Sequence, residues 1–556
     1  MKRLLQILLV MILCYWSLRP LLIRGYFPMH DDTQVARVVD MGRALQNGQI
    51  PVRMVKDLGY GYGYPLFNFY GPLPYYIGGF LHAVGISGLS ATKIMIAMGV
   101  VLSAVTMFIF LERMFSVWAA VTGAMMYVYA PYHALDIYVR GAIGELWVFA
   151  FLPLVFWGIY ESVILGKKRS FIIGAFGLWG VIVSHTISGY ITATAMGIVI
   201  AFIFLSQIVR KKALRPVFML LLIMVVALSA STFFWLPALL ELKFTSVFNF
   251  LWDTTVFSDH FVCPGQLWNS VWGFGGSMRG CIDGLSFKLG KIHLISAAAG
   301  FLGLVYTLMS AKNNLNKYLL PIVIGFVTII SLFLTLEISV LIWQFVPLSN
   351  YIQYPWRFLV FTVFGISYFA AFFVQFLCGK KPIGFMVASA IIFSTILINA
   401  KLFIPQYIYA KTAADFESNY DISWRASKIS DEYLPADFVR PSSFADTYHD
   451  TIPDEDGLTV REIVNNETYI KLQVTNALTP RTVKIARAYF PGYEYWVNGR
   501  KVTPVIHQGL PQVMIGSDFS TIEVFFKNTL PRLIGNIISF MSAVGIIYFY
   551  GKKSVS

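Results

Sequence analysis

Long runs of apolar residues recur along most of this 556-residue chain and constrain its fold more than any other feature. A helix of about 20 apolar residues matches the hydrocarbon thickness of a bilayer. Charged residues make up only 13% of the chain, against about 25% in a soluble domain. We therefore predict a polytopic α-helical membrane protein with about 12 transmembrane helices. The predicted spans are 4–23, 92–111, 115–131, 145–165, 170–185, 187–208, 217–239, 292–310, 318–343, 355–377, 383–403 and 533–550.

Short clusters of basic residues separate these apolar runs. The formal net charge is +14, but the clusters lie between spans rather than in one polar domain, which argues against nucleic-acid binding. Basic loops stay cytoplasmic, and counting spans from Lys2 and Arg3 puts every cluster on one side. We therefore expect both termini to be cytoplasmic. The clusters are Lys167-Lys168-Arg169, Arg210-Lys211-Lys212, Lys312 to Lys317, Lys380-Lys381 and Lys552-Lys553.

The polar regions on the predicted outer face divide the chain into three parts. Alternating stretches such as TYIKLQV and STIEVFF predict strands, and Asn498-Gly499 fits a two-residue hairpin turn. We therefore expect an extracytoplasmic β-rich domain, a small sandwich, before the last helix. The parts are 1–403 for the transmembrane domain, with outer loops 24–91, 132–144, 240–291 and 344–357; 404–532 for the β-rich domain; and 533–556 for the final helix and cytoplasmic tail.

Residues 72–86, PLPYYIGGFLHAVGI, form a short apolar segment that we do not count as a span. Counting it would move every later basic cluster to the opposite side of the membrane. We therefore predict an interfacial or re-entrant helix.

Cys263 and Cys281 share the third outer loop. An oxidising exterior permits a disulfide there, and closing a loop of this size stabilises a fold by roughly 3 kcal/mol. Metal binding is the weaker interpretation, because two isolated cysteines lack the spacing of a zinc site.

His30, Asp31 and Asp32 follow the first apolar run, where the first span leaves the membrane. Apolar residues then recur at helical spacing and predict an amphipathic helix along the membrane surface, ending near Asn47-Gly48. One acid suits the N-cap of this helix, which leaves the second without a task. The alternative is a carboxylate that acts as a general base on an acceptor hydroxyl or amide. The sequence alone does not show which of Asp31 and Asp32 is the cap and which is the base.

A Gly- and Tyr-rich stretch, DLGYGYGYPLFNFYGPLPYY, follows at residues 57–76. It suits neither a helix nor a strand, and we predict a rigid aromatic loop. Two interpretations stay open for Tyr62, Tyr64 and Tyr70. They form either an aromatic belt at the membrane interface or a wall on which a sugar stacks.

The acidic pair, the stretch ARVVDMGRALQNGQIPVRM and the run FYGPLPYYI together resemble the first loop of GT-C membrane glycosyltransferases. They are similar to the protein O-mannosyltransferases and the lipid A aminoarabinose transferases. In those families the first-loop acid is the catalytic base or a metal-associated carboxylate, and a polyprenyl phosphate carries the sugar. The resemblance implies that Asp31 or Asp32 is the catalytic carboxylate of an inverting transfer, and we expect the adjacent His30 to bind the substrate or its phosphate. The stretch NFYGPLP lacks the basic residue of the aminoarabinose group, so the donor phosphate needs another partner.

Charged candidates for that partner lie in two other outer loops. Asp136, Arg140 and Glu145 belong to YHALDIYVRGAIGE, which resembles the second acidic loop of oligosaccharyltransferase catalytic subunits in position only. Arg140 and Arg357, the latter in IQYPWRF, suit the binding of a phosphate. The alternatives are an ordinary helical ion pair of Asp136 with Arg140, a Glu145 that favours a helix N-terminus, and snorkelling of Arg357. We interpret His185, at a turn between two spans, as structural.

The stretches ARAYFPGYEYWVNGRKVTPV and YPWRFLVF resemble YfhO-type bacterial membrane proteins, some of which carry a 6-pyruvoyl-tetrahydropterin-synthase-related label. This resemblance implies the bacterial plasma (inner) membrane. With the first loop, it implies transfer of a hexosyl or other glycosyl group from a polyprenyl-phosphate sugar lipid to an envelope lipid, polymer or protein. A flippase of lipid-linked glycans and an envelope scaffold are the alternatives. Asp31, Asp32 and Asp136 would offer oxygen ligands to Mg or Mn, and the resemblance leaves metal dependence open.

Overall fold

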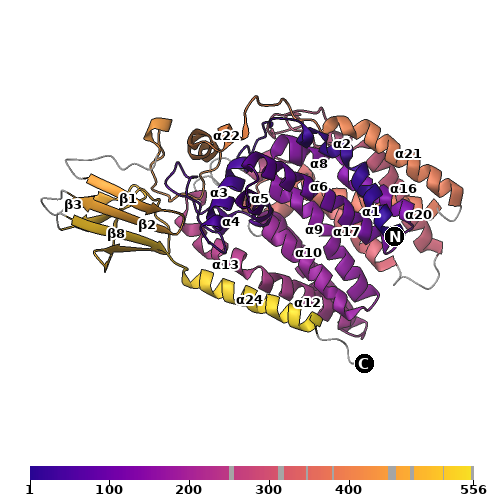
Figure 1. Cartoon of the computed structure of the whole chain (residues 1–556). Helices are drawn as coiled ribbons and strands as arrows, with labels where there is room; N and C mark the ends of the chain where they lie inside the picture. The colour runs from indigo at the N-terminus through magenta and orange to yellow at the C-terminus, as the bar shows by residue number, and fades with distance from the viewer. Residues whose placement is uncertain are drawn as a thin grey trace.

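The structure, a computed structural model, consists of a helical bundle with a β-sandwich at one end (Figure 1). It describes residues 1–248, 256–310, 318–345, 349–377, 381–448, 459–475, 481–516 and 519–551. Lys312 to Lys317, Lys380 and Lys552-Lys553 of the basic clusters lie outside these ranges. The first helix begins and the last helix ends on the side of the bundle away from the sandwich. Their cytoplasmic orientation stays a prediction.

Apolar helices occupy all twelve positions at which the sequence predicts a span, so the polytopic helical class is confirmed. By length and hydropathy, seven helices among the described residues are able to cross a membrane, or up to nine if each of two bent pairs is one span. The count of twelve therefore stays a prediction. The long helices are α6 (Gly88–Glu112), α9 (Ile143–Ile159, extended by a π-helical turn), α11 (Thr186–Val209), α16 (Lys291–Ser310), α20 (Leu359–Leu377), α21 (Lys381–Asn399) and α24 (Leu530–Gly551).

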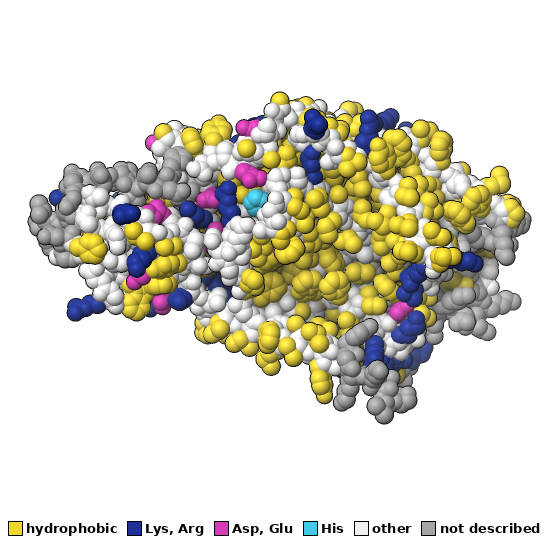
Figure 2. Space-filling model, viewed as in Figure 1, with side chains coloured by type: hydrophobic (Ala, Val, Ile, Leu, Met, Phe, Trp, Pro, Cys, Tyr) yellow, Lys and Arg dark blue, Asp and Glu magenta, His cyan; other side chains and the backbone are white. Residues whose placement is uncertain are grey.

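The other expected spans are bent or short. The bent pairs are α1 (Lys2–Leu13) with α2 (Tyr15–Leu18), and α12 (Arg215–Ala230) with α13 (Thr232–Glu241). The short helices are α7 (Val117–Val128), α10 (Phe171–Ser184) and α17 (Leu319–Thr335). Figure 2 shows hydrophobic side chains over most of the visible face of the bundle, as expected for a surface in contact with lipid.

Short helices fill the loops between the spans. The 11-residue α5 (Leu73–Ala83) lies where the sequence predicts an interfacial or re-entrant helix. At about 1.5 Å per residue it is only about half as long as a bilayer core is thick. The remaining short helices are α4 (Leu66–Phe69), α8 (Pro131–Leu135), α15 (Pro264–Trp268), α18 (Val340–Trp343), α19 (Ser349–Ile352), α22 (Ala413–Phe416) and α23 (Ser427–Ile429).

The predicted amphipathic helix of the first loop is present as α3 (Gln34–Gln46), with Asn47 as its C-cap. It packs against α5 through a close approach of two backbones, because a Cβ on Gly79 would lie 3.0 Å from the backbone nitrogen of Gly42. Most of α3 is buried on all sides rather than on one apolar face. The first loop is therefore part of the protein core and not an attachment to the membrane surface.

Among the described residues of the predicted β-rich domain, 404–532, strands occupy only the range 459–526. Residues 404–448 instead form short helical turns that pack on the first loop, through Tyr409 N–H to the carbonyl of Tyr26 and Arg425 to Asp32. The strands are β1 (Thr459–Asn465), β2 (Tyr469–Thr475), β3 (Arg481–Lys484), β4 (Tyr493–Val497), β5 (Arg500–Val502), β6 (Val505–His507), β7 (Leu510–Ile515) and β8 (Phe519–Phe526).

Two antiparallel sheets, in the orders β1-β2-β8-β4-β5 and β3-β7-β6, make the predicted small sandwich. Alternate residues from both sheets, such as Leu472, Val513 and Ile522, form its core. The predicted hairpin joins β4 and β5, and both turn residues have positive φ, +47° for Asn498 and +75° for Gly499. This is the backbone of a type I′ turn, which favours Asn-Gly.

Candidate functional site

A pocket of about 470 Å³ is lined by charged, polar and aromatic residues from several loops. Segments far apart in the chain meet there: the first loop, the second loop, the disulfide loop and the segment before α20. Six residues singled out in the sequence line this pocket, namely His30, Asp31, Tyr70, Arg140, Glu145 and Arg357. Five others that sequence reasoning did not assign to a site also line it: His185, His260, Ser277, Tyr354 and Trp356.

Asp31 presents a well-oriented carboxylate to the pocket. One oxygen accepts from Thr33 Oγ1 at 2.9 Å, and the other accepts from Arg37 at 2.9 Å and from Tyr70 Oη at 3.2 Å. Arg37 is almost completely buried, and its guanidinium lies 4.1 Å from the centre of the Tyr70 ring. The Asp31 side chain keeps 28% of its surface exposed. The group is therefore rigidly held and still accessible from the pocket.

Backbone hydrogen bonds place Asp31 beside the second loop. The N–H of His30 donates to the carbonyl of Val139, and the N–H of Asp31 donates to the carbonyl of Arg140, both at 2.9 Å. Gln34 adds a side-chain bond to the carbonyl of Gly141 at 2.8 Å. The two loops are thus joined edge to edge, which explains how residues over 100 positions apart line one cavity.

Asp32 points away from the pocket. Its carboxylate accepts from Arg425 and from Tyr409 Oη, each at 2.9 Å. Arg425 also binds Asp421, which in turn pairs with Lys411. Burial outweighs the attraction of Arg425 and raises the pKa of Asp32. This acid therefore anchors residues 404–448 to the first loop.

The N-cap interpretation of the acidic pair is wrong. The residue at the N-cap of α3 is Thr33, and no side chain makes a capping hydrogen bond there. Both acids instead bind arginines that the local sequence pattern does not pair with them, Arg37 for Asp31 and Arg425 for Asp32. Their roles differ because their partners differ.

Arg140 is already matched by acidic groups. It bonds to Asp136 on its own π-helical turn and to Glu145 at 2.7 Å, and Tyr132 Oη lies 3.2 Å away. Burial and the nearby Glu145 raise the pKa of Asp136 well above its usual range. The guanidinium also stacks 4.2 Å from the Trp356 ring centre. The positive charge of Arg140 is thus largely matched by its two acidic neighbours, Asp136 and Glu145.

Arg357 is less directly matched by acidic groups than Arg140, although the charge of Glu145 attracts it. Its guanidinium donates to the carbonyl of Ile352 at 2.7 Å and to the side-chain oxygen of Gln353 at 3.1 Å, both neutral. In the part of the chain that the structure describes, it forms no ion pair with a carboxylate, and its Nε has no hydrogen-bond partner. Between the two arginines, Arg357 is the better placed to bind an anion.

Three histidines contribute to the rim of the pocket. The His30 ring bonds to the carbonyl of Phe274 at 3.0 Å, and the His260 ring bonds to Ser277 at 3.1 Å and packs on Tyr354. His185 bonds to Ser188 at the start of α11 and also lines the pocket. The predicted structural role of His185 is compatible with that bond, but its ring also faces the cavity.

The aromatic loop divides between the pocket and the protein interior. Tyr70 lines the cavity and donates to Asp31. Tyr62 packs on Phe438 and Tyr448, and Tyr64 is buried against Tyr433. The structure therefore places Tyr62 and Tyr64 outside the pocket, where they attach the loop to residues 404–448.

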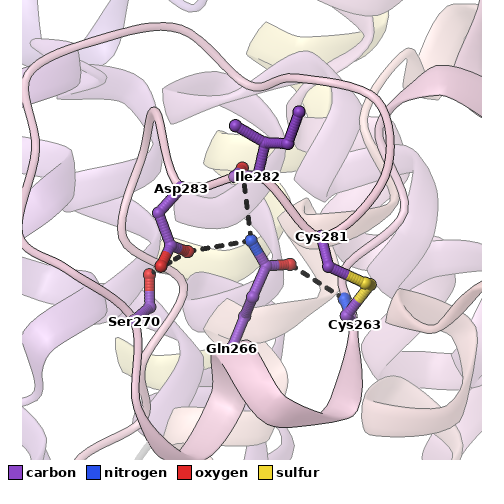
Figure 3. Close-up of a disulfide and its surroundings, with 6 residues drawn as sticks. All are labelled: Cys263, Gln266, Ser270, Cys281, Ile282 and Asp283. Atoms are coloured by element: carbon purple, nitrogen blue, oxygen red, sulfur yellow. Dashed lines mark hydrogen bonds between the residues drawn. A yellow bond between two sulfur atoms is a disulfide. The ribbon is translucent and has the colours of Figure 1, made fainter.

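A disulfide-bonded loop forms one wall of the pocket. Cys263 and Cys281 are joined, and Gln266 of the closed segment bonds to Asp283, two residues after Cys281 (Figure 3). Asp283 accepts from Gln266 at 2.9 Å and from Ser270 at 2.7 Å. The disulfide thereby closes the segment that contains Phe274, the partner of His30.

Replacing both cysteines of this disulfide by serine is expected to loosen the wall. The loop of 18 residues loses a constraint of roughly 3 kcal/mol. Hydrogen exchange measured by mass spectrometry is expected to rise in peptides from residues 256–290. Peptides from the sandwich, which contains no cysteine, serve as the internal control. Unchanged exchange in the loop would show that its hydrogen bonds hold it alone.

The three acids suggested as metal ligands do not converge. Asp31 binds Arg37, Asp32 binds Arg425 and Asp136 binds Arg140. Within the described ranges no group of three or more His, Cys, Asp or Glu side chains has the geometry to hold a metal ion. Asp31, Asp32 and Asp136 therefore do not form a Mg or Mn site together.

The bundle, the sandwich and the pocket define a polytopic membrane protein with a polar site beside its spanning helices. A family model described as a 6-pyruvoyl-tetrahydropterin synthase related domain, membrane protein, matches residues 67–405. The chain belongs to this family, which confirms the resemblance to membrane proteins with a 6-pyruvoyl-tetrahydropterin-synthase-related label.

Other comparisons are more distant. A protein of Lactococcus lactis subsp. cremoris described as uncharacterized is 23% identical over 233 residues, which cover 41% of this chain and 38% of that protein. The apo oligosaccharyltransferase of Archaeoglobus fulgidus superposes with a TM-score of 0.47 at 12% identity, over 81% of this chain and 61% of that one. Arabinofuranosyltransferase AftD from mycobacteria gives 0.46 at 13% identity, over 73% and 27%. The chain thus spans less than two thirds of each of these proteins.

Proposed function

We propose that this chain is a membrane glycosyltransferase of the GT-C type, which moves a glycosyl group from a polyprenyl-phosphate-linked donor to an acceptor in the cell envelope. The observation that carries the proposal is the pocket, in which the Asp31 carboxylate and the Arg357 guanidinium face one cavity beside the spanning helices. The likeness of the first loop to that of GT-C enzymes supports the same assignment. A lipid-linked donor reaches such a site from the bilayer.

In the proposed reaction, Asp31 accepts the proton of an acceptor hydroxyl or amide as its oxygen or nitrogen attacks the anomeric carbon. The bond from that carbon to the phosphate oxygen breaks, and the electron pair leaves with the lipid phosphate. Arg357 stabilises the charge that develops on this leaving group. A single displacement of this kind inverts the configuration of the sugar.

The other pocket residues take supporting roles. Arg37 and Tyr70 fix the orientation of the Asp31 carboxylate, which matters because a misplaced base loses much of its catalytic effect. Arg140, held by Asp136 and Glu145, packs on Trp356 and forms a rigid part of the pocket wall. His30 and His260 offer ring nitrogens at the rim, where hydroxyl groups of a sugar or acceptor enter.

The position of the charged groups favours transfer over transport. A transporter is expected to carry ionisable groups near the middle of its spans. Here Glu145 lies in the first turn of α9, and Arg357 lies just before α20. Both are at helix ends and both face the same pocket. A scaffold protein would not need charged groups gathered around one pocket.

The test is the glycan composition of the envelope in a deletion strain, determined by mass spectrometry. The strain is complemented with the wild-type chain or with the Asp31→Asn variant at matched protein levels. We expect a glycan that only the wild-type chain restores. If the variant restores every glycan, the catalytic proposal fails, and accumulation of an unflipped lipid-linked glycan in the deletion strain would favour the flippase alternative.

A further inference from the structure

A second cavity, of about 530 Å³, lies between the final helix and the rest of the bundle. Its walls are almost entirely apolar and include Leu73 of α5, Trp179 of α10 and Phe233 of α13. From α24, Asn536 and Phe540 also face it. We call this cavity the α24 groove. None of its lining residues lines the pocket described above.

A buried arginine lies directly behind this groove. Arg53 is 3% exposed and donates to the side-chain oxygen of Asn536, to the carbonyl of Phe233 and to the side-chain oxygen of Asn68. All three acceptors are neutral, and its Nε has no partner. Among the described residues Arg53 forms no ion pair. Burial and the neighbouring Arg532 lower the pKa of Arg53 to about 10.

The nearest acid does not offset this charge. Glu241 pairs with Arg532 at 2.9 Å and also accepts from Asn68 at 2.8 Å. The three ionised groups, Arg53, Arg532 and Glu241, therefore sum to one positive charge. An unmatched charge away from water is unfavourable, and an anion next to Asn536 would complete the cluster.

Asn536 connects this charge to the groove. Its side-chain oxygen is occupied by Arg53, so its amide N–H groups are the donors left on the groove side. Asn536 lies six residues into α24, about 9 Å below the start of the helix. An apolar groove below a positive, hydrogen-bond-donating end matches one amphiphilic anion.

We propose that the α24 groove binds one anionic phospholipid of the surrounding leaflet, with its phosphate at Asn536, in front of the buried Arg53, and an acyl chain along Trp179 and Phe540. The occupant carries a phosphodiester because that group supplies the single negative charge the cluster lacks. The bound lipid fills the space between α24 and α10. This inference does not depend on the proposed transfer reaction.

Native mass spectrometry of the full-length protein tests the proposal. The probes are phosphatidylglycerol and, with the same acyl chains, zwitterionic phosphatidylcholine. We expect one retained phosphatidylglycerol per chain and little phosphatidylcholine. Arg53→Gln is expected to weaken phosphatidylglycerol binding about fivefold, while Arg53→Lys retains most of it. Equal retention of the two lipids would overturn the proposal.

A second pair of variants separates lipid binding from folding. Phe540 lines the groove and is 71% exposed, whereas Met541 is 66% exposed and does not line it. Neither side chain is needed for the core. Phe540→Ala is expected to lower phosphatidylglycerol retention severalfold, and Met541→Ala is expected to leave it unchanged. Equal effects of the two variants, or complete displacement of phosphatidylglycerol by an equimolar polyprenyl phosphate, would also overturn the proposal.

Discussion

Asp31→Asn is expected to reduce glycosyl transfer at least about 100-fold, because an amide cannot accept the acceptor proton and general-base catalysis contributes about 10²- to 10⁴-fold. The fold is expected to survive. The Asn oxygen can still accept from Arg37, the new amide N–H can donate to Thr33 Oγ1, and the side chain is partly exposed. The measurement is product formed per unit of protein, with thermal unfolding followed in parallel on the purified chain.

Asp32→Asn is the matched control, since it makes the same chemical change one residue away. Asp32 does not line the pocket, and it pairs with Arg425. We expect transfer to stay within a few fold of the wild type. The free energy of unfolding is expected to fall by about 1–2 kcal/mol, because Arg425 keeps Asp421 as a partner. If Asp32→Asn abolishes transfer while Asp31→Asn does not, the roles assigned to the two acids are wrong.

The membrane class, the first-loop helix and the hairpin were predictable because each depends on local pattern. Apolar length predicts spans, helical spacing predicts α3, and Asn498-Gly499 favours one turn type. The burial of α3 was not predictable. It depends on α5 and on residues 404–448, which contact α3 only in the folded chain. Residues 404–448 have no strong periodicity, so composition alone assigned them to the β-rich part.

The pocket was predictable in part. Asp31, Arg140 and Arg357 stand out as charged residues beside apolar runs, and the structure brings them into one cavity. Choosing between Asp31 and Asp32 required a partner 393 positions away, Arg425. His260 was missed because Ser277 of the disulfide loop and Tyr354 position it, and nothing in its local sequence indicates that it lines the pocket.

Arg357→Gln is expected to weaken binding of a polyprenyl phosphate by about 10- to 100-fold. A charge-assisted hydrogen bond to phosphate contributes about 1.5–3 kcal/mol, and no carboxylate in the described part of the chain pairs with this guanidinium. Folding is expected to be little affected, because the bonds that Arg357 makes are to neutral oxygens at the edge of a helix. The measurement is the dissociation constant for the lipid phosphate in detergent. Arg357→Lys is expected to keep part of the affinity, since the charge remains but the planar fork is lost.

Arg140→Gln provides the contrast that identifies the phosphate-binding arginine. Its removal leaves Asp136 and Glu145 buried together without their shared cation. The expected cost is about 3–5 kcal/mol of folding free energy, seen as a lower unfolding temperature and a poor yield of folded protein. Any Arg140→Gln protein that does fold is expected to bind lipid phosphate better than Arg357→Gln does. The opposite order would mean that Arg140, despite its two acidic neighbours, is the group that contacts the donor.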